Sequence, residues 1–158
     1  MRYARLCTVT AHERPMILPD VNVLVYAARD HAAANARYRE WLEHALAGPE
    51  PVALATPVLA SFLRVVTNPR VFAQPSELDD ALRFVDAVLA GPAATVPALS
   101  QRLAGLLTEV CRRAGATADR VPDAYLAAIA LDLDAELITA DRGFARFAGL
   151  RWRHPLDA

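Results

Sequence analysis

The chain has 158 residues, 54% of them hydrophobic, which is enough for a single domain with its own core. Its formal net charge of −1 excludes an overall basic surface for nucleic acid, and all seventeen Lys and Arg positions are arginine. Without lysine there is no phosphate-binding P-loop, and no GxGxxG, HExxH or CxxC motif is present. Cys7 and Cys111 fit no disulfide framework, and no segment has the pattern of a signal peptide or membrane span, so we expect a cytoplasmic protein.

Residues 1–15 show no clear period and end in a proline, which predicts a loosely ordered extension before a single domain over 16–158. In chain order we predict strand 16–20, helix 21–29, helix 31–47, strand 52–56, helix 58–67, helix 75–90, strand 94–97, helix 99–110, helix 123–133, strand 136–140, a turn or short helix over 142–147, and strand 150–153. Strands that alternate with helices predict an α/β fold with a mostly parallel central sheet flanked by helices. Trp41 and Phe62 are expected in the core.

Three aspartates stand where the predicted elements begin or end. Asp20 follows the first strand, Asp141 follows the strand 136–140, and Asp123 opens an alanine-rich helix just after a proline. The carboxyl ends of parallel strands meet at one edge of a sheet, where ligands bind, so we expect these three side chains to converge. Like charges in one cleft repel, and a hard cation such as Mg²⁺ with oxygen ligands relieves that repulsion.

Each aspartate also has a purely structural interpretation. Asp20 and Asp123 fit helix capping or first-turn positions, and Asp141 before Arg142-Gly143 fits the start of a turn. The convergence of all three favours a site.

Polar residues elsewhere are more ambiguous. Ser61, Arg64 and Asn68 share one face of their helix, where Arg64 either contacts phosphate or is simply solvated. Solvated surface is the favoured interpretation for a further set of arginines and histidines, with RNA or partner contacts as the alternative: Arg112, Arg113, Arg120, His31 and His44.

Four ordered segments carry a resemblance to a known family: 19–26 (PDVNVLVY), 62–72 (FLRVVTNPRVF), 123–130 (DAYLAAIA) and 137–144 (LITADRGF). They resemble the successive motifs of PIN-domain ribonucleases, and most of all VapC-type toxins of toxin–antitoxin pairs. The resemblance runs from about residue 16 to 155. It implies a three-layer fold and an endoribonuclease that depends on Mg²⁺ or Mn²⁺, held here by Asp20, Asp123 and Asp141.

The same resemblance assigns supporting residues and partners. Asn22 and Thr139 match polar positions beside the first and last aspartates. Ser61 stands where many PIN domains carry a glutamate, which leaves three carboxylates. The implied partners are an RNA substrate, a VapB-type antitoxin that covers the acidic cleft, and a second copy of the chain in a homodimer; no membrane is implied.

Two other functions remain open at this stage. Ser61 is also consistent with a weakened metal site, in which case the chain is a scaffold that binds RNA or an antitoxin. A phosphatase or phospho-acceptor domain also begins with an aspartate after its first strand, but such sites usually need a lysine, and this chain has none.

Overall fold

Five parallel strands form the central sheet of the computed structural model, which describes residues 15–29 and 33–157. The strand order across the sheet is β3-β2-β1-β4-β5. The strands are β1 (Ile17–Pro19), β2 (Val52–Ala53), β3 (Ala94–Thr95), β4 (Glu136–Ile138) and β5 (Trp152–Arg153). The predicted fold class is confirmed, and all the strand pairs are parallel.

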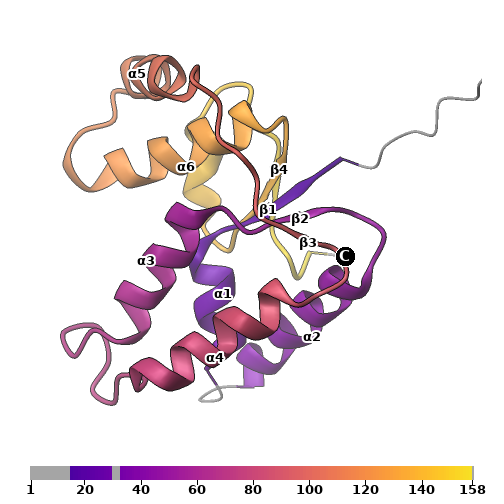
Figure 1. The fold of residues 1–158 in the computed structure, drawn as a ribbon. Helices are drawn as coiled ribbons and strands as arrows, with labels where there is room; N and C mark the ends of the chain where they lie inside the picture. Colours follow the sequence, from indigo (N-terminus) through magenta and orange to yellow (C-terminus); the bar gives the residue numbers. More distant parts are fainter. Residues whose placement is uncertain (1–14, 30–32, 158) are drawn as a thin grey trace, which may run out of the picture.

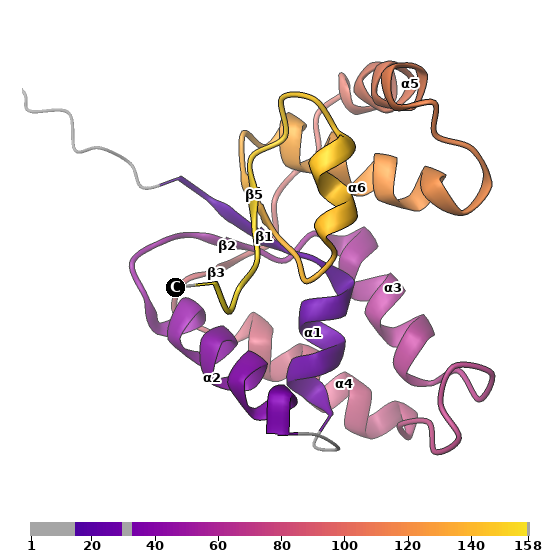
Figure 2. The same cartoon turned by 180° about the vertical axis from the view of Figure 1, so that it is seen from behind.

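Helices cover both faces of this sheet, so the domain has three layers. Figures 1 and 2 show α1 to α4 on one side of the sheet and α5 with α6 on the other. The helices are α1 (Val21–Ala28), α2 (Ala33–Ala47), α3 (Thr56–Val66), α4 (Leu78–Leu89), α5 (Leu103–Ala114) and α6 (Val121–Asp132), with short 3₁₀ turns η1 (Ala118–Arg120) and η2 (Arg142–Arg146).

The core forms where the apolar strands meet small or branched helix residues. In α6 the alanines at 124, 127, 128 and 130 are all fully buried, because small side chains let this helix approach the sheet closely while α5 covers its other side. Phe62 on α3 is 1% exposed, and its ring lies 5.0 Å from that of Phe84 on α4. Phe62 is therefore a core residue as predicted, whereas Trp41 is half-buried at the edge of the core.

Several element boundaries differ from those predicted. All five strands are shorter than expected. The helix predicted from residue 99 begins at Leu103, because the backbone N–H of Ser100 donates to Asp132 Oδ2 at 2.8 Å and holds that segment as a loop. The helix predicted from residue 75 begins at Leu78, since Ser76 N donates to the carbonyl of Val66 at 2.8 Å.

Some predictions concern residues outside the described ranges. The extension falls almost wholly on 1–14, and both His31 and Cys7 lie outside the described residues as well. Within those ranges Cys111 is a free, half-buried cysteine, and we find no helix whose length and hydropathy suffice to cross a membrane.

Candidate active site

The site begins with the pairing of β1 and β4. Pro19 stands opposite Ile138 in the register of these strands, and the backbone N–H of Asp20 donates to the carbonyl of Ile138 at 2.8 Å. The next residue on each strand is therefore brought to the same place, although Asp20 and Thr139 are 119 positions apart in the sequence. This is the carboxyl edge of the sheet, where the sequence predicted the site.

Thr139 is the centre of a hydrogen-bond network. Its hydroxyl is fully buried and donates to Asp20 Oδ2 at 2.6 Å. The same Oγ1 accepts from Asp141 N at 3.0 Å and from Asn22 Nδ2 at 3.2 Å. Asn22 Nδ2 also lies 2.7 Å from Asp20 Oδ2, and its Oδ1 accepts from Ala140 N at 3.2 Å. The Asp20 side chain is thus fixed by two donors and makes no capping hydrogen bond with α1, which argues against the capping interpretation.

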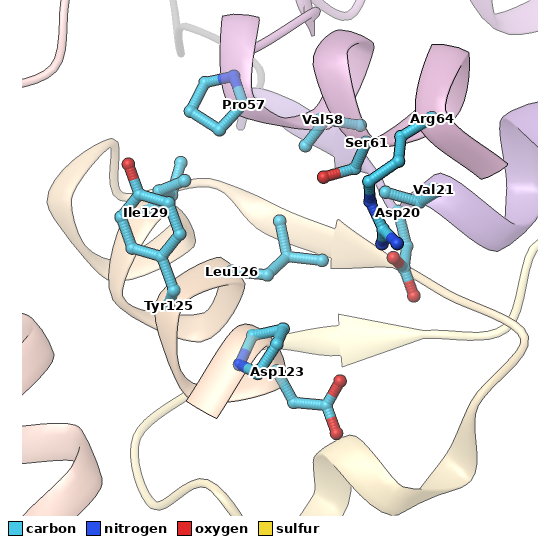
Figure 3. A pocket seen from close by; sticks show the side chains of 11 residues that line it. Asp20, Val21, Pro57, Val58, Ser61, Arg64, Asp123, Tyr125, Leu126 and Ile129 are labelled. Carbon is cyan, nitrogen blue, oxygen red and sulfur yellow. The ribbon is translucent and has the colours of Figure 1, made fainter. Parts of the chain in front are cut away.

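Asp123 lies across a cavity from α3. It is the third residue of α6, which starts at Val121, two positions earlier than predicted, because η1 leads directly into it. Asp20 and Asp123 both line a cavity of about 240 Å³ between α3 and α6. Figure 3 shows the two carboxylates at one end of this space. Ser61 and Arg64 of α3 line the cavity as well. Asn68, the third member of the predicted polar face, lies beyond the end of α3 and is not part of the lining.

Asp141 has a structural role that the sequence also predicted. It occupies the N-cap of η2, where its Oδ1 accepts from Gly143 N at 2.7 Å. Its exposed side chain is not among those that line the cavity, but its charge raises the pKa of both Asp20 and Asp123. The three aspartates are therefore electrostatic neighbours, as expected from the fold.

Burial is the main cause of the perturbed titration of Asp20. This side chain is 7% exposed, and desolvation, with smaller contributions from the charges of Asp123 and Asp141, raises its pKa from 3.8 to about 6 against the opposing Thr139 hydrogen bond. Burial also raises the pKa of Asp123, as does the charge of Asp141, while Arg146 opposes the rise. A carboxylate whose ionised form is disfavoured in this way gains from a nearby cation.

The donor set suits a hard divalent cation in chemistry, because carboxylate oxygens are the ligands that Mg²⁺ prefers. As the side chains stand, no three His, Cys, Asp or Glu residues within 15–29 and 33–157 converge closely enough to form a metal-binding group. The fit therefore lies in the charges of the three aspartates and in the burial of Asp20.

The other basic and histidine candidates lie away from the cavity lining. Arg112 and Arg113 on α5 both pair with Glu109, at 2.9 and 2.5 Å. Arg120 is exposed at the start of α6, and the exposed His44 places Nδ1 2.9 Å from the carbonyl of Glu40.

Sequence reasoning missed Arg146 and the apolar wall of the cavity. Arg146 Nε donates to Gly143 O at 2.7 Å, so its charge stands beside the aspartates. Most of the apolar wall comes from one face each of α3 and α6, which a helical spacing continued from Ser61 and from Asp123 would have revealed, and Val21 at the start of α1 completes it. Its members are Val21, Pro57, Val58, Pro122, Tyr125, Leu126 and Ile129.

The fold and this site define an open α/β domain with an acidic cleft at the carboxyl edge of a parallel sheet. The chain belongs to the PIN domain family, whose model matches residues 17–150.

Curated relatives and solved structures agree with this assignment. The chain is 47% identical over 142 residues to Ribonuclease VapC43 of Mycobacterium tuberculosis, which covers 90% of this chain and 97% of that protein. It is 41% identical to Ribonuclease VapC25 of the same organism, over 89% of this chain and 99% of that protein. In fold it is similar to FitAcB from Neisseria gonorrhoeae, with a TM-score of 0.64 and 23% identity over 90% of this chain and 100% of that one. VapBC2 from Rickettsia felis, solved with a DNA fragment from its promoter, gives a TM-score of 0.64 at 18% identity over 88% of this chain and 98% of that one.

Proposed function

We propose that this protein is a VapC-type endoribonuclease toxin, dependent on Mg²⁺ or Mn²⁺ and neutralised by a cognate antitoxin. Membership of the PIN domain family and the similarity to curated VapC ribonucleases support the activity. The observation that carries the proposal is the acidic end of the cavity, where Asp20 and Asp123 lie together and the charge of Asp141 acts on both.

In this proposal Asp20, Asp123 and Asp141 hold the cation. When bound, the ion lowers the pKa of a coordinated water and offsets the negative charge that develops on the phosphate during hydrolysis. Ser61 contributes a hydroxyl to the cavity where many family members have a carboxylate, so the cation depends on three aspartates.

The remaining polar residues keep these carboxylates in place and hold the substrate. Thr139 and Asn22 fix the rotamer of Asp20 through hydrogen bonds of 2.6 and 2.7 Å to Oδ2, so the other carboxylate oxygen has a defined direction. Asp123 or Asp141 orients the attacking water, and hydrolysis leaves a phosphate monoester on one RNA fragment and a hydroxyl on the other. In the described part of the chain Arg64 has no ion-pair partner, which leaves its guanidinium available to an RNA phosphate.

An antitoxin is the second partner in this proposal. Structures similar in fold include VapBC complexes, and the relatives are VapC proteins. An antitoxin segment that occludes the acidic end, with an arginine directed toward Asp20 and Asp123, would satisfy the same charges as the metal ion and block RNA. The corresponding binding-only function gains no specific support from the geometry, because Asp20, Asn22 and Thr139 retain an ordered arrangement despite Ser61.

The experiment is cleavage of total RNA by the purified, antitoxin-free chain with Mg²⁺ or Mn²⁺. We expect discrete fragments that disappear with EDTA and in the Asp20→Asn variant. Circular dichroism of both proteins provides the control for folding. Cleavage by Asp20→Asn at the parental rate would refute the role of this aspartate, and folded parent protein that cleaves no RNA with either metal would refute the enzymatic function.

Cation binding has a separate readout in the thermal stability of the chain. A ligand that binds only the folded state stabilises it, by about 2.7 kcal/mol at a concentration 100 times its Kd. We expect Mn²⁺ to raise the Tm of the parent chain and to have a much smaller effect on Asp20→Asn. Equal shifts in both proteins would show that the ion binds elsewhere.

A further inference from the structure

The acidic cavity has an apolar half that catalysis by carboxylates does not explain. Beyond Asp20 and Asp123, the cavity is bounded by the buried side chains of Val58 on α3 and of Leu126 and Ile129 on α6, which are 3%, 8% and 1% exposed. A hydrated metal ion needs oxygen ligands and gains nothing from aliphatic walls. This half of the cavity therefore suits an apolar part of the substrate and not the metal ion or the phosphate.

The lining residues at the two ends of the cavity and its volume indicate which part of the substrate fits. Figure 3 shows the ring of half-buried Tyr125 with Pro57 at one end, Leu126 between, and Asp20 with Arg64 at the other end. The volume of about 240 Å³ lies just below the range of about 300–1,000 Å³ that is usual for pockets holding drug-sized ligands, so there is room for one ring system. Ser61 lies in the lining between these ends and offers one hydroxyl as hydrogen-bond donor or acceptor.

We propose that this apolar half, formed by Pro57, Val58, Tyr125, Leu126 and Ile129, is a subsite for one unstacked nucleobase of the RNA next to the scissile phosphate. The inference rests on the proposed function. An aromatic ring and aliphatic walls bind the faces of a base, while Arg64 at the acidic end holds the adjoining phosphate. A base can enter this half of the cavity only if it has left its stack.

A protein side chain is the competing occupant, because an aliphatic residue of an antitoxin also suits such walls. The continuity of the apolar half with Asp20 and Asp123 in one cavity favours the base. When an RNA phosphate lies at the carboxylates, the base of the same or the adjacent nucleotide must lie close by. The apolar half is close enough to receive that base, because Asp20 and Asp123 line the same cavity.

The test uses the intact chain and a short single-stranded RNA that it cleaves, with 2-aminopurine placed in turn at each position around the cleaved bond. We expect one position whose fluorescence is quenched on binding to Asp20→Asn, which prevents cleavage during the measurement. An abasic nucleotide at that position should reduce cleavage by the parent chain about tenfold or more, the scale of losing one base–aromatic stack. Abasic substitutions elsewhere should have less effect.

Matched variants test the walls of the subsite. Tyr125→Ala should weaken RNA binding and remove the quenching, whereas Tyr125→Phe, which keeps the ring, should retain both. Leu78→Ala removes an apolar side chain that is 57% exposed on α4, outside the cavity, and controls for general loss of surface. If the Ala variant at 125 fails to fold, the abasic and 2-aminopurine series on the parent chain and on Asp20→Asn still decides the question.

The outcomes separate this inference from the proposed function. Metal-dependent cleavage that is indifferent to the base at every position would overturn the subsite and leave the ribonuclease standing. Retained RNA binding by Tyr125→Ala together with lost antitoxin binding would assign the apolar half to the antitoxin and also overturn the inference. If the folded parent chain cleaves no RNA at all, the proposed function itself has failed.

Discussion

The buried Asp20 carboxylate should make the metal-free chain less stable as the pH rises. Well below pH 3.8 this group is protonated in both the folded and the unfolded chain. Between 3.8 and about 6 the folded chain retains a proton that the unfolded chain has released, so the free energy of unfolding falls with increasing pH. At about 1.4 kcal/mol for each pH unit, the difference between the two pKa values corresponds to about 3 kcal/mol, lost in full above about pH 6.

Replacing Asp20 with Asn should remove this pH-dependent fall in the free energy of unfolding. The Asn side-chain carbonyl still accepts from Thr139 and Asn22, but it carries no charge. At pH 7 in EDTA we expect the variant to be more stable than the parent by up to about 3 kcal/mol, or about 6 to 12 °C in Tm for a domain of this size. At pH 3.5 the two proteins should have nearly equal stability.

The assay is urea unfolding of both proteins at pH values from 3.5 to 7.5, followed by circular dichroism, with EDTA throughout. The difference in unfolding free energy should grow between pH 4 and 6 and then stay constant. A difference that is the same at pH 4 and pH 7 would refute the argument that a buried, ionised Asp20 destabilises the fold.

Three further substitutions test the surroundings of the site. Thr139→Val removes the buried hydroxyl donor of Asp20 and leaves only Asn22 Nδ2 on Oδ2, so it should cost about 1–3 kcal/mol in urea unfolding as well as most of the RNA cleavage. Thr139→Ser should retain both, and equal activity of the two variants would contradict the role of the hydroxyl. Gly143→Ala places a Cβ 2.6 Å from Arg146 Nη2 and 2.8 Å from Asp141 Oδ1, so the end of the flexible arginine must move and the capping carboxylate of Asp141 is displaced. We expect a stability change below about 1 kcal/mol but cleavage reduced about tenfold, and unchanged cleavage would show that the η2 geometry is unimportant. Phe62→Ala should lower the unfolding free energy by about 3–5 kcal/mol, and a loss under 1 kcal/mol would contradict its placement in the core.

The sequence by itself determined the order of the elements and the identity of the acidic residues. Periodicity predicts each helix and strand because burial of one face follows from local spacing, and an apolar strand followed by a carboxylate is visible without any coordinates. The parallel sheet followed from the alternation of strands and helices, and its carboxyl edge predicted the convergence of Asp20, Asp123 and Asp141. The structure places Asp20 and Asp123 in one cavity, whereas Asp141 lies outside its lining.

Only the tertiary structure decided how these residues differ from one another. The β1–β4 register places Thr139 against Asp20, so that Asp20 is buried and its pKa rises, while Asp141 remains exposed at the N-cap of η2. Arg146 approaches the aspartates through a hydrogen bond to Gly143 that no sequence period signals.

The apolar half of the cavity was likewise decided by packing. Val58 and Leu126 look like ordinary core positions in the sequence, and they line a cavity only because α3 and α6, which lie on opposite faces of the sheet, both reach its carboxyl edge. Side-chain periodicity fixes which face of a helix is apolar, but the space between two helices depends on where the sheet places their axes, and that is a property of the assembled fold.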